Sequence, residues 1–267
     1  MSVHRDTDGS VAIITIDRPD VRNAVDGATA AALLDAVETA DADADVAVIV
    51  LTGAGGTFCA GADLHAVGEP GRGNSLTRDD HGPMGPTRRT PSKPTIAAVE
   101  GHAVAGGLEL ALWCDLRVAA RDAVLGVFCR RWGVPLIDGG TVRLPHIVGL
   151  GRAMDLILTG RAVGAEEARA MGLVTSVAEP GDALAAALEL ANELARLPQT
   201  TLRADLASAR AAFDRPLPEA LLAEHDGGVA AIEAGGMTDV ARFRAGAGRH
   251  GGAAAPAAAP ADGSTRP

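Results

Sequence analysis

The residues best placed for chemistry lie in the stretch 95–117, where a glutamate follows a pair of glycines. A β-branched, apolar run leads toward Gly106 and Gly107, and Glu109 follows them at the start of a helical pattern. Glycines at a helix start let the backbone approach a ligand, and the first-turn N–H groups there have no partner inside the helix. The stretch therefore predicts an electrophilic pocket with a carboxylate beside it. The alternative is that Glu109 is only a favourable first-turn acid and that the glycines only pack.

A second glycine-rich junction lies at residues 53–64, after a continuous apolar strand predicted over 46–52. We interpret it as another strand–glycine–helix junction. It matches a dinucleotide-binding motif only in part, because Phe58 stands where the third glycine should be and no acidic residue ends the next strand at the required spacing. The motif therefore argues against a nicotinamide or flavin site, and an NAD-dependent oxidoreductase is the weakest competing class.

Two further side chains with useful chemistry follow. Cys129 ends a short apolar run, and its thiol would need a base or a positive neighbour to act as a nucleophile, so a packing role fits it better. Asp138 stands before a predicted helix, where it can serve as the N-cap. It can also serve as an acid whose pKa is raised by the apolar loop around it, which includes Trp132 and Ile137. The histidines show no metal-ligand spacing, so no metal site is predicted.

The rest of the chain predicts the elements that position these residues. A strand over 11–17 precedes a helix over about 27–40, which Asp26 can cap. Residues 68–93 are rich in Gly, Pro, Arg and Asp, and we predict a mobile loop beside the site. Helices dominate farther along the chain. Residues 251–267 are mainly Ala, Pro and Gly without a period, which predicts a disordered tail.

Composition and charge exclude several classes of partner. With 267 residues the chain can form one large domain or slightly more, and 47% hydrophobic content with only 2% aromatics predicts a core of Ala, Val and Leu. A net charge of −10 without a basic block argues against nucleic acid. No signal segment is seen, and no apolar run is long enough for a bilayer. Three cysteines without metal spacing fit free thiols in a reducing compartment, so a cytoplasmic protein is expected.

Several segments, in this order along the chain, resemble one known family. They are 57–64, 93–101, 106–111, 115–117, 138–141, 158–161 and 172–174. Over about residues 8–245 the chain resembles the crotonase, or enoyl-CoA hydratase/isomerase, family. The resemblance implies an α/β fold, a crotonase-like spiral of ββα units with a C-terminal helical region. The domains it implies are a ββα core with the acyl-CoA site at 1–195 and a helical trimerisation region at 196–250, followed by the tail at 251–267.

The resemblance also implies a site that stabilises the enolate of a coenzyme A thioester. By position it assigns the two oxyanion-hole amides to Ala62 and Gly106 and the acid/base to Glu109. No cofactor is implied, since coenzyme A is part of the substrate. Arg22 is a candidate contact for the phosphates of coenzyme A. The other predicted substrate contacts are Ala60, Gly61, Asp63, Leu64, Gly107 and Cys129.

One position departs from the pattern of the family's hydratases, which hold a water between two glutamates. Glu109 matches one of them, and Cys129 stands in the place of the other. A thiol, with a reference pKa of about 8.5, cannot share a water proton at neutral pH as a carboxylate does. Asp138 matches an aspartate that moves a proton in the dienoyl-CoA isomerase branch. We therefore predict Asp138 as the second catalytic residue, with the N-cap role as its alternative.

These observations predict an acyl-CoA enzyme that hydrates 2-enoyl-CoA, with Glu109 as acid/base. Enoyl- or dienoyl-CoA double-bond isomerisation by Glu109 and Asp138 is the first alternative. A non-catalytic acyl-CoA binding protein of the same fold is the second. The resemblance implies a homotrimer or a dimer of trimers, and the Leu-rich helices after residue 182 have more apolar surface than a terminal extension needs. No nucleic-acid partner and no membrane partner is expected.

Overall fold

The computed structural model describes residues 2–78, 81–237 and 240–246. The predicted disordered tail at 251–267 lies outside these residues. The contacts of the chain separate it into two units, Met1–Ala195 and Arg196–Pro267.

A six-stranded sheet forms the centre of the first unit. Its strand order is β1-β2-β3-β4-β6-β9, with β1 antiparallel to β2 and every other neighbouring pair parallel. Ile14, Leu51 and Ala97 stand level on adjacent strands, and all three are buried. The bounds are β1 (Val3–Asp8), β2 (Val11–Ile16), β3 (Val48–Gly53), β4 (Thr95–Val99), β6 (Leu116–Ala120) and β9 (Ser176–Ala178).

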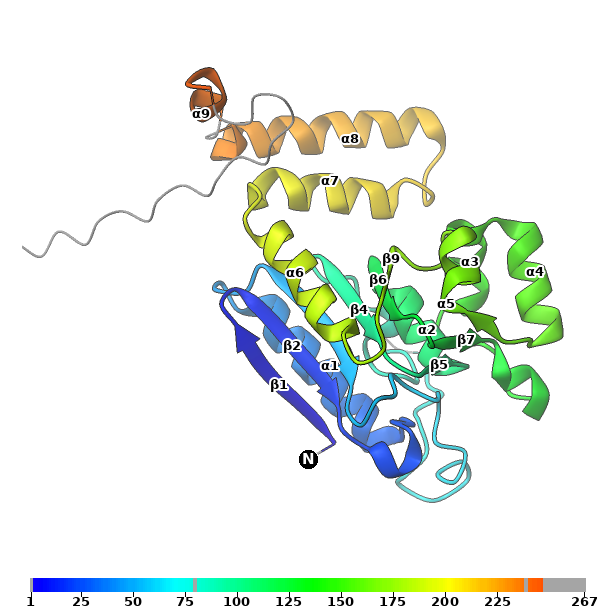
Figure 1. Cartoon of the computed structure of the whole chain (residues 1–267). Helices are drawn as coiled ribbons and strands as arrows, with labels where there is room; N and C mark the ends of the chain where they lie inside the picture. Colours follow the sequence, from blue (N-terminus) through cyan, green and yellow to red (C-terminus); the bar gives the residue numbers. More distant parts are fainter. Residues whose placement is uncertain (1, 79–80, 238–239, 247–267) are drawn as a thin grey trace, which may run out of the picture. The chain divides into compact units, whose positions relative to one another are not determined.

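Helices cover both faces of this sheet, which explains why β3 has no polar face. Ile49 and Leu51 belong to the same core cluster as Leu33 of α1 (Gly27–Ala42). Val48 and Val50 pack instead with Ala187 of α6 (Ala183–Ala195). Figure 1 shows α1 and α6 on opposite faces of the strands. A parallel sheet buried on both faces selects the continuous apolar strands seen in the sequence.

The predicted cap of α1 is confirmed, because the side chain of Asp26 accepts a hydrogen bond of 2.9 Å from the Thr29 amide. The helix predicted after the junction at 53–64 is wrong. The amides of Phe58 and Cys59 donate to the carbonyls of Glu100 and His102, both at 2.8 Å. This pairing keeps the segment extended, and turns follow it in place of a helix.

A smaller sheet and a set of short helices complete the first unit. The sheet has the order β5-β7-β8, and α2 follows directly after β5. Gly160 ends α4 in the left-handed conformation, with φ of 58°. The bounds are β5 (His102–Val104), α2 (Gly106–Trp113), β7 (Val124–Gly126), β8 (Val163–Gly164), α3 (Gly140–Val148), α4 (Leu150–Thr159) and α5 (Ala165–Ala170). The 3₁₀ turns are η1 (Pro19–Val21), η2 (Pro86–Arg88) and η3 (Phe128–Trp132).

The second unit is helical. The helices α7 (Gln199–Ala211) and α8 (Leu217–Ala231) pack on each other, and the turn Ile232–Gly236 and α9 (Val240–Arg244) follow. Leu217, Leu221 and Leu222 of α8 are more than half exposed. Across the described residues, no helix is both long enough and apolar enough to span a membrane.

Candidate active site

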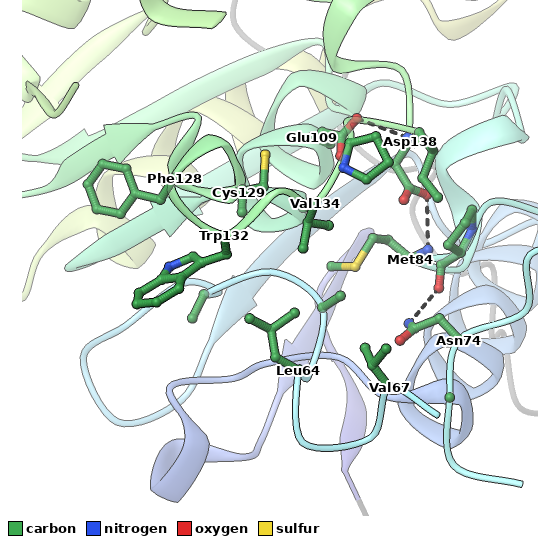
Figure 2. A pocket seen from close by; sticks show the side chains of 18 of the residues that line it. Leu64, Val67, Asn74, Met84, Glu109, Phe128, Cys129, Trp132, Val134 and Asp138 are labelled. Carbon is green, nitrogen blue, oxygen red and sulfur yellow. Dashed lines mark hydrogen bonds between the residues drawn. The ribbon is translucent and has the colours of Figure 1, made fainter. Parts of the chain in front are cut away.

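A cavity of about 550 Å³ lies in the first unit and brings the candidate residues together. Its wall is mainly apolar and is contributed by segments far apart in the sequence, as Figure 2 shows. Such a cavity has the size and character of a site for a small organic ligand. Its lining includes Ala60, Ala62, Leu64, Val67, Asn74, Met84, Gly106, Glu109, Phe128, Cys129, Trp132, Val134, Ile137 and Asp138.

Two backbone turns carry the predicted oxyanion amides into this wall. Gly61 accepts from the Val25 amide at 2.8 Å and Asp63 donates to the Val25 carbonyl at 2.9 Å, so this pairing does not use the Ala62 amide. The second turn begins α2 at Ala105, whose φ of 53° is unusual for a residue with a side chain. The two turns approach closely, because a β-carbon placed on Gly61 would lie 3.0 Å from the Gly106 nitrogen.

Neither the Ala62 amide nor the Gly106 amide donates a hydrogen bond to an acceptor among the described residues. Gly106 is the first residue of α2, where the helix offers no internal acceptor. Backbone donors of this kind can stabilise negative charge that develops on a carbonyl oxygen. The assignment of these two amides as an oxyanion hole stays a prediction with a favourable geometry.

Glu109 lies on the first turn of α2 and is 3% exposed. Its Oε1 accepts hydrogen bonds from the amides of Asp138 at 2.9 Å and Gly140 at 2.8 Å. Burial, with a smaller contribution from the charge of Asp138, raises the pKa of Glu109 to about 7. The hydrogen bonds from the two backbone amides and the charge of Arg143 lower this pKa. A carboxyl group with such a pKa can both take and give a proton at neutral pH.

Asp138 is the second buried carboxyl of the cavity, 4% exposed. Its Oδ1 accepts from the Met84 amide at 2.9 Å and from the hydroxyl of Thr87. The predicted N-cap role is wrong, because Gly139 is the N-cap of α3 and no side chain caps this helix. Burial raises the pKa of Asp138, whereas the hydrogen bonds from Thr87 and Met84 act to lower it.

Asp138 is also contacted by a segment that sequence reasoning did not connect with it. Trp132 is 72% exposed and Ile137 is 43% exposed, so neither of these two neighbours in sequence is itself buried. The enclosing residues include Met84 and Thr87, which come from the predicted loop at 68–93. The part from Gly82 to Thr87 is buried, a feature that the prediction of a mobile loop over 68–93 did not include.

Cys129 lies in η3, lines the cavity and is 5% exposed. Burial first, and then the charge of Glu109, raise the pKa of its thiol. The thiol is therefore neutral at pH 7 and is poorly suited to nucleophilic attack or proton abstraction. This state agrees with the interpretation of Cys129 as a packing residue at the edge of the site.

The remaining predicted contacts divide between the wall and its support. Ala60 and Leu64 line the cavity, whereas Gly61, Asp63 and Gly107 are not among its lining residues. Asp63 is buried and forms an ion pair with Arg18 at 3.0 Å. A β-carbon on Gly107 would lie 2.0 Å from the Cys59 carbonyl oxygen, so this glycine permits a close backbone approach. Arg22 is exposed and does not line the cavity.

Comparison with known proteins gives one consistent answer. The family model described as enoyl-CoA hydratase/isomerase matches residues 6–233. The chain is 39% identical over 219 residues to "Enoyl-CoA hydratase EchA19" of Mycobacterium tuberculosis, an alignment that covers 79% of this chain and 81% of that protein. It is 43% identical to "Putative enoyl-CoA hydratase" of Thermus thermophilus, with 73% of this chain and 78% of that protein covered.

The fold agrees with solved structures of the same kind. The crystal structure of enoyl-CoA hydratase EchA1 from Mycobacterium marinum superposes with a TM-score of 0.86 at 38% identity, covering 91% of this chain and 95% of that one. The predicted crotonase-like α/β fold is therefore confirmed. Family, fold and the arrangement of the cavity agree, and this chain belongs to the enoyl-CoA hydratase/isomerase family.

Proposed function

We propose that the chain adds water across the C2–C3 double bond of 2-enoyl-CoA thioesters. The observation that carries this proposal is Glu109, a buried carboxyl with a pKa of about 7 in an apolar cavity. It lies on the same helical turn as the Gly106 amide, which has no acceptor among the described residues. Relatives named as enoyl-CoA hydratases support it, among them "Short-chain-enoyl-CoA hydratase" of Clostridium acetobutylicum at 38% identity.

The geometry supports a mechanism with one carboxyl as the proton carrier. The thioester oxygen accepts from the amides of Ala62 and Gly106, which draws electron density away from C3. Ionised Glu109 takes a proton from a water molecule, whose oxygen bonds to C3 while the double-bond electrons move toward the thioester oxygen. Glu109 then returns the proton to C2, so that H and OH of one water are added. The steps require no cofactor beyond the coenzyme A of the substrate.

Cys129 stands where the hydratase pattern has its second glutamate, and the raised pKa of its thiol keeps it from sharing the proton. In this mechanism Glu109 therefore both removes the proton from water and delivers it to C2. A pKa of about 7 gives Glu109 comparable populations of both protonation states at neutral pH. We infer that Glu109 cycles between base and acid within one turnover.

Double-bond isomerisation is the second candidate, because Asp138 places another carboxyl in the same cavity. A panel of 2-enoyl- and 3-enoyl-CoA thioesters, read by mass spectrometry, separates the two reactions. A gain of one water supports hydration, and an unchanged mass with a shifted double bond supports isomerisation in its place. Binding of each thioester without any product would overturn both.

We further propose a cytoplasmic homotrimer or dimer of trimers. The support for assembly is the exposed apolar side of α8, which includes Leu217, Leu221 and Leu222. The three cysteines are free and buried, which fits a reducing compartment. Analytical ultracentrifugation at micromolar concentration tests the assembly, and a monomer would contradict it.

A further inference from the structure

The segment from Gly82 to Arg88, called the 82–88 segment below, is buried from Gly82 to Thr87, and Arg88 at its end is exposed. Only its last three residues, Pro86–Arg88, form a 3₁₀ turn. Gly82 and Gly85 exchange backbone hydrogen bonds of 3.0 and 2.8 Å, which close a tight turn around Met84. Gly85 has φ of 93°, and a β-carbon there would lie 2.4 Å from the Ala30 carbonyl oxygen. The turn is therefore fitted against α1 and has little room to take another shape.

Polar side chains hold this segment from two sides. Asp138 accepts from the Met84 amide and the Thr87 hydroxyl, and a β-carbon on Gly82 would lie 2.5 Å from its Oδ1. Arg143 donates to the carbonyl of Asp138 at 2.9 Å and to that of Thr87 at 2.6 Å. These bonds join the 82–88 segment to the start of α3.

On the other side, the side-chain Nδ2 of Asn74 donates to the carbonyl of Pro83 at 2.7 Å and to that of Val25 at 3.2 Å. Figure 2 shows the bonds from Asn74 and Asp138 reaching the chain around Met84 from different directions. Hydrogen bonds before Met84, at the Pro83 carbonyl, and after it, at Thr87, therefore fix the position of its backbone.

The Met84 side chain stands at the predicted anchoring point of the substrate. It is 1% exposed and lines the cavity, and a β-carbon on Gly106 would lie 2.9 Å from its sulfur. An acyl group whose carbonyl oxygen is held by the Gly106 amide must therefore pass the thioether. A buried side chain at this point limits the shape and length of the group that can follow.

We propose that the Asp138 carboxylate acts as a latch on the 82–88 segment and that Met84, held by this latch, selects the acyl group. Asp138 is then a positioning residue that acts through Met84. The inference rests on the proposed function, since it concerns the acyl group of the same thioester substrate. It assigns a role in substrate selection to the 82–88 segment, which is not one of the sequence segments on which the family resemblance rests.

The test uses straight-chain 2-enoyl-CoAs of increasing length, with kcat and KM measured separately for each. Met84→Ala is expected to raise the long-to-short ratio of kcat/KM by roughly tenfold, the size expected for small changes in an apolar pocket. Thr87→Val removes one bond of the latch and is expected to shift the ratio in the same direction, mainly through KM.

Two conservative variants separate a latch from simple loss of packing. Thr87→Ser keeps the hydroxyl and is expected to restore the length preference of the unmodified protein. Asp138→Asn keeps an acceptor oxygen, so its length preference is expected to follow the unmodified protein, while its kcat reports on proton transfer by Asp138. The ratio between substrates does not depend on the fraction of folded enzyme.

Several outcomes overturn the inference. An unchanged length preference in Met84→Ala removes Met84 as the selector, and an unchanged preference in Thr87→Val removes the latch. Loss of turnover in Asp138→Asn, together with a normal preference in Thr87→Val, makes Asp138 a proton carrier instead. If the unmodified protein hydrates no member of the series, the proposed function fails. Calorimetry with saturated acyl-CoAs of the same lengths then tests Met84 and the latch through binding alone.

Discussion

Two buried carboxyl groups share the cavity, and their surroundings differ in one respect. Glu109 and Asp138 are both less than 5% exposed, and in each one oxygen accepts two hydrogen bonds. The donors of Glu109 are two backbone amides of the turn that starts α3. The donors of Asp138 are an amide and a hydroxyl of the 82–88 segment. One carboxyl is thus held by the framework, whereas the other holds a segment that forms the wall.

The difference shows how similar burial can serve two tasks. Fixed amide dipoles next to Glu109 partly offset its desolvation and leave its pKa at about 7, within the working range of a proton carrier. The bonds of Asp138 connect parts of the chain that are about fifty residues apart in sequence. The backbone amide of Asp138 donates a hydrogen bond to Glu109. A substitution that shifts Asp138 is therefore expected to change this hydrogen bond to the acid/base as well.

Removing the carboxylate of Glu109 should have the largest effect. For Glu109→Gln we expect kcat to fall by about 10²–10⁴-fold, the usual loss when a general acid–base group is removed. Affinity for an acyl-CoA should change little, because the amide keeps the shape of the side chain. Turnover by mass spectrometry and calorimetry measure the two quantities. The matched control is Glu189→Gln on the exposed side of α6, and activity of Glu109→Gln within about threefold of this control would make Glu109 a structural acid.

Disturbing the turn that carries Ala62 should have the next largest effect. For Gly61→Ala, we expect kcat/KM to fall by roughly 10²–10³-fold, comparable to the loss of one oxyanion donor. Gly61 has φ of 101°, and the added carbon meets Ala105 and the Gly106 nitrogen at 3.0 Å. Gly56→Ala provides the control, since Gly56 has φ of 73° but open space around it. Equal losses of activity in the two variants would show that backbone strain, and not the site, is responsible.

The pKa of Glu109 predicts the pH dependence of the unmodified enzyme. If ionised Glu109 is the base, kcat/KM should rise about tenfold per pH unit up to about 7 and then level off. Because the pKa of Glu109 is raised by folding, the folded state binds the extra proton between about 4.5 and about 7. Stability should therefore fall through this window as the pH rises, by roughly 3 kcal/mol in total. Denaturant unfolding at several pH values measures this loss, and Glu109→Gln should remove it.

Sequence patterns predicted the framework well and the polar partners poorly. The continuous apolar run of β3 indicated a strand buried on both faces, and Asp26 marked the start of α1, because both signals are local. The helix predicted after Gly53 is wrong because the bonds that keep Phe58 and Cys59 extended come from residues more than forty positions away.

The candidate site shows the same division. Glu109 was found from the glycine pair that precedes it, whereas Ala62 and Gly106 were assigned by the family resemblance, with which the glycine-rich turns agree. The structure brings all three residues to one cavity. Met84 and Thr87 were missed, since no local pattern indicates that a glycine-rich loop returns to Asp138. The glycines at 82 and 85 were the available signal, because each stands where a β-carbon would meet another segment.

The smallest effect is expected at Cys129, where the chain leaves the pattern of the hydratases. Cys129→Ala should change kcat by less than about threefold, far below the loss of a general acid–base group. The physical reason is the protonation state: burial and the charge of Glu109 both raise the pKa of the thiol, so no thiolate is available near pH 7. Alanine also removes only one sulfur atom from the wall of the cavity.

The opposite substitution sharpens the comparison between the two carboxyls. Cys129→Glu restores the second glutamate of the hydratase pattern and adds a third carboxyl to the cavity. Like-charge repulsion between this new carboxylate and Glu109 should raise the pKa of Glu109. The rising limb of the kcat/KM profile is then expected to move to higher pH, while Cys129→Ala leaves it in place. Kinetics across pH 5–9, a range chosen to span about two units on either side of the Glu109 pKa, measure this shift. A dead Cys129→Ala variant with an unshifted limb in Cys129→Glu would show that the thiol itself carries the proton and that Glu109 only supports it.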